Sequence, residues 1–372
     1  MSQTSQQNAG LAQNSYSNEY EVGIYPPGRR PLFEYEGIEY KVLEHASNPL
    51  NGYQGTIYQR VDTGEIIVAH RGTEPDQGLG QILKDGVLTD GAMVLARVNP
   101  QAQDAVGLTR RAIEYAAREG RKPGSHAPEV IVIGHSLGGT LAQITAHHFN
   151  LRGETFNAYG ARSLGLKMPE HSDNVLNHVM ATDVVSAVSP HYGQVRVYAA
   201  PEEIKRLAVL GDYENNASPL DNRRPGLAAS KSAGAHSMHN FLNVGGDGRP
   251  DKSVLADSQA QHLAQAFAPM IGKYREDLAL GREIVTVAAR GPLGNALDAV
   301  DTLRGPLPAG EAAVREDRIE AKRMESVQRA ADLEERVQHF RESHSHPSGL
   351  PEVSSGPIPA SISRPDTGTP GE

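Results

Sequence analysis

A serine placed between a strand pattern and a helix pattern is the feature that most limits what this chain can fold into. Residues 130–133 are apolar and β-branched, residues 134–138 read G-H-S-L-G, and a helical pattern then continues to residue 149. This is the setting of a nucleophile elbow, a turn so sharp that the serine Oγ projects above the sheet edge. Such a turn leaves little room for a Cβ at either flanking glycine. The sequence therefore predicts Ser136 as a nucleophile, with an ordinary Gly-Ser turn as the alternative.

An oxyanion hole has to accompany such a serine. The helix expected after the elbow begins at Leu137, so its free N–H groups and positive dipole end point toward the developing oxyanion. The backbone N–H of Leu137 is the first expected donor. Residues 69–73, A-H-R-G-T, close an earlier strand. Gly72 allows a sharp turn there, and Thr73 offers its N–H and its hydroxyl as the second donor. The alternative for this stretch is a simple strand-ending turn.

The serine hydroxyl also needs a base and an acid. The base is usually a histidine that a carboxylate orients, and in α/β-hydrolase chains the order is serine, acid, histidine. Asp183 follows the apolar stretch 175–182 and comes after Ser136 in the chain. It therefore lies at the carboxyl end of an expected strand, where the active sites of open α/β sheets gather. We predict Asp183 as the acid; an Asx turn or a helix cap is the alternative.

Two histidines compete for the role of the base. His236 and His239 both lie in G-A-H-S-M-H-N-F-L, residues 234–242, which follows a loop-rich stretch and runs into apolar residues. This setting suits a base that is presented on a loop and anchored beyond it. We favour His236, and His239 stays open as the alternative.

Strand and helix patterns alternate through the middle of the chain. Alternating residues predict strands at 38–43, 55–61 and 65–70, and the last two are joined by the turn sequence D-T-G. A helical spacing covers residues 102–119 ahead of the elbow strand. Further strands follow the elbow helix. The pattern predicts the α/β class, with an α/β-hydrolase fold around a central, mostly parallel sheet.

Composition divides the chain into four parts. Residues 1–25 are rich in Gln, Asn and Ser, which predicts a disordered N-terminus. Residues 26–290 are expected to form the α/β-hydrolase domain. Residues 291–346 are expected to form a helical extension, because a charged helical pattern covers 315–344. From residue 347 to 372, Pro, Ser and Gly dominate, which predicts a disordered tail.

Charge and the N-terminal sequence exclude some functions. The formal net charge of -9 argues against nucleic acid as a partner. The chain has no cysteine, so it has no disulfide and no thiolate metal site. Its N-terminus lacks the basic-then-apolar pattern of a signal peptide, and no stretch approaches the length of a membrane span. We expect a protein that is made in the cytoplasm and that would be exported only by a signal-peptide-independent route.

Four motifs together resemble the class 3 lipase family, the fungal-lipase-like branch of the α/β hydrolases. They are A-H-R-G-T at 69–73, G-H-S-L-G-G at 134–139, T-F-N-A-Y-G at 155–160 and T-D-V-V at 182–185. The resemblance covers residues 36–245 and leaves both tails unexplained.

The resemblance implies a serine esterase that hydrolyses carboxylic esters of lipids. It would act as a lipase or a phospholipase A through an acyl-enzyme, with no cofactor and no metal. The resemblance implies Ser136 as nucleophile and Asp183 as acid, with Thr73 and Leu137 in the oxyanion hole. The expected partner is a lipid or phospholipid, reached by transient contact with a membrane surface.

The family also provides expectations for the histidine and for a lid. Residues 236–241 are similar to the histidine segment of bacterial members, in which the first histidine is the base. Fungal members have a tyrosine three residues after that histidine, where this chain has His239. Family members often carry a lid over the site, and residues 74–97 occupy that place.

The setting of the activity follows from the same resemblance. Bacterial members without a signal peptide include antibacterial effectors, which would imply a secretion partner and a cognate inhibitor. Two alternatives stay open. One is a cytosolic hydrolase of small esters or thioesters, and the other is a catalytically silent interaction protein that acts through its C-terminal region.

Overall fold

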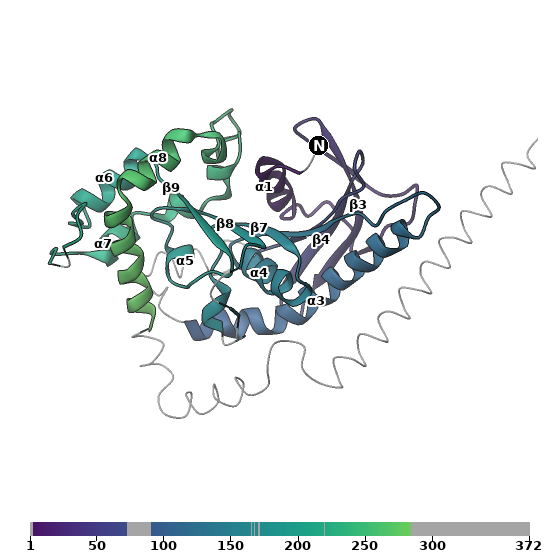
Figure 1. Ribbon diagram of the computed structural model, residues 1–372, viewed down its shortest axis with the longest axis horizontal. Coiled ribbons are helices and arrows are strands. Elements are labelled where there is room, and N and C mark those ends of the chain that lie inside the picture. Colours follow the sequence, from purple (N-terminus) through teal and green to yellow (C-terminus); the bar gives the residue numbers. More distant parts are fainter. Residues whose placement is uncertain are drawn as a thin grey trace, which may run out of the picture. The chain divides into compact units, whose positions relative to one another are not determined.

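A mixed sheet with helices on both faces organises the part of the chain that the structure describes (Figure 1). In the computed structural model, the described residues are 3–72 and 91–283, without 165, 167, 170, 171 and 219 and without the side chains of 91–97 and 99. Within these ranges the sheet has nine strands in the order β1-β3-β4-β5-β6-β7-β8-β9, and β2 also pairs with β3.

The N-terminal half of the sheet is antiparallel. Its strands are β1 (Gly23–Ile24), β2 (Leu32–Tyr35), β3 (Ile38–Asn48), β4 (Tyr53–Arg60) and β5 (Ile66–His70). The turn between β4 and β5 contains Gly64 at φ 77°, a conformation that glycine adopts at little cost. The predicted hairpin is therefore present, with β4 and β5 paired antiparallel.

The second half of the sheet is parallel and carries the elbow. It contains β5, β6 (Val130–His135), β7 (Arg152–Phe156), β8 (Val175–Met180) and β9 (Gln194–Tyr198). Helix α3 (Gly91–Gly120) precedes β6, and α4 (Leu137–Phe149) crosses from β6 to β7. This confirms the α/β-hydrolase fold; the central sheet is mixed, and its parallel part, β5 to β9, carries the elbow.

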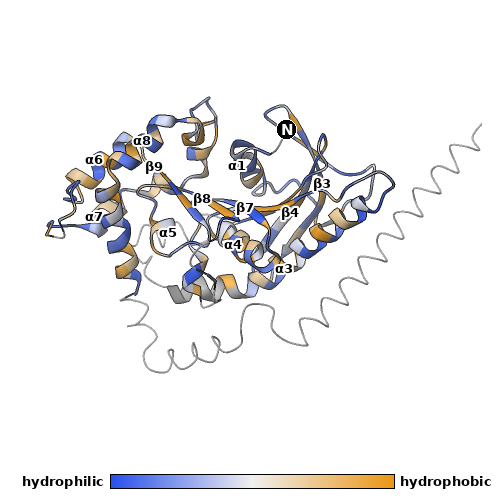
Figure 2. Ribbon diagram, in the orientation of Figure 1, coloured by the Kyte–Doolittle hydropathy of each residue, from blue (hydrophilic) through white to orange (hydrophobic). Residues whose placement is uncertain are grey.

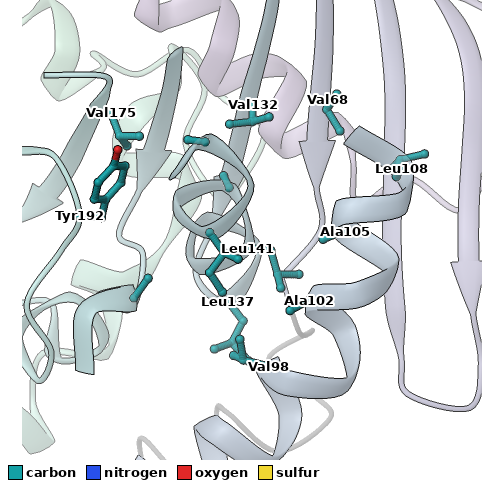
Figure 3. Packing of buried hydrophobic residues seen from close by; sticks show 14 of the residues in the cluster. Val68, Val98, Ala102, Ala105, Leu108, Val132, Leu137, Leu141, Val175 and Tyr192 are labelled. Carbon is teal, nitrogen blue, oxygen red and sulfur yellow. The ribbon is translucent and has the colours of Figure 1, made fainter. Parts of the chain in front are cut away.

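Alternation along the central strands creates a core on each face of the sheet. Ile66 and Val68 of β5 belong to the cluster under α3 and α4, whereas Ile67 and Ala69 belong to the cluster on the face of α1. Successive strand residues point to opposite faces, so a strand covered on both sides has to be apolar throughout. The strands carry orange, hydrophobic stretches together with blue ones such as part of β7, and the helices also show both kinds of residue (Figure 2). Figure 3 shows side chains of the α3 and α4 cluster.

The expectation that residues 1–25 are disordered is wrong for the described part of that segment. Helix α1 (Ser5–Asn14) begins with a capping box between Thr4 and Gln7, and its Leu11 is completely buried. Polar residues in this helix are satisfied inside the protein, because Ser5 and Asn8 both donate to the Glu154 carboxylate. The polar composition therefore did not predict this helix, which packs on the domain largely through hydrogen bonds rather than through an apolar face.

Short helices and turns surround the carboxyl ends of β8 and β9. The set comprises the α-helices α5 (Val184–Ala187), α6 (Pro201–Val209), α7 (Pro225–Ser230) and α8 (Ser258–Ala266), and the 3-10 helices η2 (Ala161–Leu164), η3 (Ala233–His236), η4 (Met238–Phe241) and η5 (Val254–Ala256). Residues 268–283 are also helical. The predicted boundary at 290, the helical extension 291–346 and the tail 347–372 lie outside the described residues. No helix in the described ranges combines the length and apolarity that crossing a membrane requires.

Candidate active site

Ser136 lies on the predicted elbow between β6 and α4. Its backbone has φ 57° and ψ -128°, a region that non-glycine residues rarely adopt, and its side chain is buried. A Cβ on Gly134 would overlap the backbone of Gly138 and Gly139, and a Cβ on Gly138 would overlap the turn after β5. The two flanking glycines are therefore required by close packing around the strained serine.

His236 ends the 3-10 helix η3 and reaches the serine. Its Nε2 lies 2.9 Å from the Ser136 Oγ, and its Nδ1 lies 2.9 Å from the Asp183 Oδ1. A carboxylate can only accept, so Nδ1 carries the hydrogen and Nε2 is free to accept the serine proton. The arrangement therefore leaves the imidazole in the tautomer that a general base needs.

Asp183 caps α5 shortly after the end of β8 at Met180, and it is fully buried. Its Oδ2 accepts the N–H of Ser186 at 3.0 Å, and its Oδ1 accepts the N–H of Val185 at 3.3 Å as well as the His236 ring. Burial alone would raise the pKa of this carboxyl, but the charge interaction and hydrogen bond with His236, joined by the bonds from Ser186, lower the pKa overall. Asp183 is therefore both a helix cap and the partner of His236.

His239 lies away from this arrangement. Its Nδ1 donates to the carbonyl oxygen of Val244 at 3.1 Å, and η4, the 3-10 helix that contains it, follows η3 in the chain. Of the two predicted histidines, the structure brings His236 to Ser136 and Asp183, and it directs His239 to a neighbouring loop.

Of the two predicted oxyanion donors, the structure describes Leu137 but not Thr73. Leu137 is the first residue of α4, so its N–H lies at the helix N-terminus beside the serine. Thr73 lies outside the described residues, as do most of the predicted lid residues 74–97. The described residue before Thr73 is Gly72, and a Cβ placed on it would lie 2.6 Å from the His135 carbonyl oxygen and 3.2 Å from the Ser136 Cβ. The turn that leads to Thr73 is therefore packed directly against the elbow.

Asn157 is a residue of the site that the sequence analysis did not single out. It follows β7 with φ 44°, donates to the carbonyl of Ala235 at 2.7 Å, and accepts the N–H of Met180 at 2.9 Å. It thus ties the residue before His236 to the end of the strand before Asp183. Its place directly after a strand, in the motif T-F-N-A-Y-G, is the pattern that could have identified it.

No metal-binding cluster of three or more His, Asp or Glu side chains is present in residues 3–72 and 91–283 as described. The chemistry that this arrangement can perform is nucleophilic attack by Ser136 with His236 as proton acceptor.

One comparison with known proteins identifies the family of this chain. A model of the phospholipase-like family, described as the Tle-like phospholipase domain, matches residues 7–194. This range contains Ser136 and Asp183 and ends before His236.

Three fungal lipase structures are similar to parts of the chain. The Lip2 lipase from Yarrowia lipolytica has 14% identity over 53% of this chain and 78% of its own, with a TM-score of 0.34. A lipase from Rhizopus microsporus var. chinensis has 20% identity over 50% and 68%, with a TM-score of 0.31. The Rhizomucor miehei lipase propeptide complex has 17% identity over 51% and 66%, with a TM-score of 0.34. No curated protein matches the chain.

Proposed function

We propose that Ser136, His236 and Asp183 form the catalytic triad of this chain, which belongs to the family of Tle-like phospholipase domains and hydrolyses carboxylic esters of lipids. The substrate we propose is a phospholipid, cleaved at an acyl ester as by a phospholipase A. The observation that carries this proposal is the pair of 2.9 Å contacts that join the three side chains in the order acid, base and nucleophile.

The first half of the reaction forms an acyl-enzyme. The Ser136 Oγ attacks the ester carbonyl carbon while its proton moves to the His236 Nε2, and Asp183 stabilises the resulting imidazolium. The negative charge on the carbonyl oxygen is held by the N–H of Leu137 and, as we propose, by Thr73. Collapse of this intermediate expels the lysophospholipid alkoxide, which takes the proton from His236. The serine then carries the acyl group as an ester.

The second half of the reaction releases the fatty acid. His236 takes a proton from a water molecule, and the hydroxide attacks the acyl carbonyl in the same oxyanion hole. When the second intermediate collapses, the proton returns from His236 to the Ser136 Oγ. The net reaction consumes one water and one ester bond and yields a lysophospholipid and a fatty acid.

Hydrolysis of phospholipid vesicles tests the proposal. Wild-type protein should release fatty acid and lysophospholipid from vesicles of phosphatidylethanolamine and phosphatidylglycerol. Ser136→Ala should lower kcat by about three to six orders of magnitude, because it removes the nucleophile. Ser125→Ala, which changes an exposed serine in the turn after α3, is the matched control and should act as wild type.

Other outcomes of the same assay would contradict the proposal. Activity on soluble short-chain esters with none on vesicles would favour a small-ester or thioester hydrolase. No hydrolysis, combined with no labelling of Ser136 by a fluorophosphonate probe, would favour a silent interaction protein.

We propose further that the substrate lies in the membrane of another bacterium, so that the chain acts as an antibacterial effector with a secretion partner and a cognate inhibitor. The support is the resemblance to class 3 lipases. Expression in the periplasm of a susceptible bacterium should slow growth, and Ser136→Ala should not. Equal growth with both proteins would contradict the effector role.

A further inference from the structure

The segment that follows α1 reaches the candidate active site through Tyr16. A Cβ placed on Gly72 would lie 2.5 Å from the Tyr16 Oη and 3.2 Å from the Ser136 Cβ, so the phenol lies against the turn beside the nucleophile. The Arg71 guanidinium lies 5.4 Å from the Tyr16 ring centroid and also donates to Asn18 at 2.9 Å. The N-terminal segment is therefore fastened to the end of β5.

The tautomer of His135 follows from its two hydrogen bonds. The His135 Nε2 lies 2.9 Å from the carbonyl oxygen of His236, and a carbonyl can only accept, so Nε2 carries a hydrogen. Burial, reinforced by the neighbouring His236, lowers the pKa of His135 to about 3, so the ring is neutral near pH 7. Nδ1 is then unprotonated and accepts the Tyr16 hydroxyl at 3.0 Å.

The Tyr16 oxygen also has an acceptor role. The backbone of Gly72 lies beside this oxygen and favours its ionised form, and since the phenol proton points to His135, the Gly72 N–H is the group that can donate to it. A directed chain therefore runs from the Gly72 N–H through Tyr16 and His135 to the carbonyl of His236. It joins the turn that leads to Thr73 with the backbone of the residue proposed as the base.

We propose that Tyr16 and His135 are positioning residues that keep the His236 backbone and the Gly72 turn in fixed positions relative to Ser136. The proposal rests on the triad proposed above. The rings of His135 and His236 are 4.9 Å apart, and Asn157 holds the carbonyl of the preceding Ala235. The backbone of the base is thus fixed at two successive carbonyls, and the chain through Tyr16 fixes the one that belongs to His236 itself.

Loss of the Tyr16 hydroxyl should lower turnover without weakening substrate binding. Without that donor, the His135 Nδ1 is a buried acceptor with a missing partner, so the ring can exchange tautomers or turn and release the His236 carbonyl. We expect Tyr16→Phe to lower kcat about tenfold, equivalent to about 1.4 kcal/mol, with KM changed less than about twofold. The assay uses a soluble p-nitrophenyl ester, which avoids effects of binding to vesicles.

A double-mutant cycle separates positioning from general packing. The His135→Gln side chain can still donate from its Nε2 to the His236 carbonyl. An amide does not exchange tautomers as an imidazole does, so this donation does not require the Tyr16 hydroxyl. Tyr16→Phe should therefore cost less than about twofold in the His135→Gln background, since the two residues act in one chain. Tyr20→Phe is the matched control: it removes a hydroxyl of the same segment that donates to Asn14, and it should leave kcat unchanged.

A spectroscopic readout covers the case in which the double variant fails to fold. The ¹⁵N shifts of the His135 ring should report the Nε2–H tautomer in wild type and a mixture of tautomers in Tyr16→Phe.

Three results would overturn the positioning role. They are an unchanged kcat in Tyr16→Phe, an equal loss in both His135 backgrounds, and a single unchanged tautomer in the variant. Each of these results counts against the positioning role alone when the wild-type protein hydrolyses the ester. A wild-type protein that neither hydrolyses esters nor labels with a fluorophosphonate instead overturns the proposed triad, and the positioning role with it.

Discussion

His236 and His239 lie three residues apart but have different hydrogen-bond partners, so we expect their substitution to affect activity differently. His236→Ala removes the side chain that bridges Ser136 and Asp183 and should lower kcat by about three orders of magnitude or more. His239→Ala removes a hydrogen bond to a loop carbonyl and should change kcat by less than about twofold. Ester hydrolysis by the two variants, compared at pH 8, measures the difference.

Labelling with a fluorophosphonate probe supplies the control for that comparison. Circular dichroism should show that both variants are folded, and His239→Ala should label at the wild-type rate. A loss of activity in His239→Ala equal to that in His236→Ala would contradict the assignment.

The sequence pattern predicted some residues of the candidate site but not others. Ser136 could be found because an elbow needs glycines at fixed positions, and Asp183 because it follows a strand later in the chain. The choice between His236 and His239 depends on how two consecutive 3-10 turns, η3 and η4, are oriented, which the apolar pattern does not encode. Tyr16 was missed because its hydrogen bond to His135 spans 119 positions in the chain.

Among the elements, helix α1 is the one that the sequence pattern did not predict. Periodicity identifies a helix by its apolar stripe, and α1 has little of one. Its docking depends instead on hydrogen bonds that reach distant residues, such as the bond from Gln6 to the Phe241 carbonyl at 2.9 Å. The elbow strand and helix were predictable because their apolar residues fill the core of the sheet on either side.

A substitution in α1 tests whether this helix is an integral part of the fold. Leu11 is completely buried against the face of the sheet opposite α3 and α4. Leu11→Ala should lower the free energy of unfolding by about 2–5 kcal/mol, because it removes buried methyl groups and leaves a cavity. Leu50→Ala, at a position 95% exposed, is the matched control and should change stability by less than about 0.5 kcal/mol. Urea unfolding followed by circular dichroism measures both, and an equally small effect of the two substitutions would mean that α1 is not docked in solution.

At the scale of the whole molecule, the order of the sheet explains how distant residues meet. Strands β6, β7 and β8 are parallel neighbours, so their carboxyl ends lie at one edge. Ser136, Asn157 and Asp183 each follow one of these strands, and His236 is added from a later turn. Active sites of parallel α/β sheets gather at this edge because successive strands deliver their following loops to the same place.

The buried histidines give the whole molecule a predictable sensitivity to acid. Burial lowers the pKa of His70 and His135 to about 3, and burial together with the charge of Arg275 lowers the pKa of His191 to about 4. Each ring is neutral in the folded state but takes up a proton in the unfolded chain below about pH 6.5. The unfolded state then binds more protons, so the free energy of unfolding falls as the pH falls from about 6.5 toward these folded-state pKa values.

Each such histidine contributes about 1.4 kcal/mol per pH unit within that window, so the three together give a slope of about 4 kcal/mol per pH unit between pH 6 and pH 5. Because domains have only about 5–15 kcal/mol of stability, a loss of this size is a large fraction of the total by pH 5. Urea unfolding at pH 7.5, 6.5, 5.5 and 5.0 measures the slope. His191→Gln, which can still donate to the Ala158 carbonyl, should reduce the slope by about one third, whereas His262→Gln at an exposed position should leave it unchanged. A free energy of unfolding that stays constant from pH 7.5 to pH 5.0 would mean that these rings take up protons in the folded protein at the same pH as in the unfolded chain, so that burial does not lower their pKa.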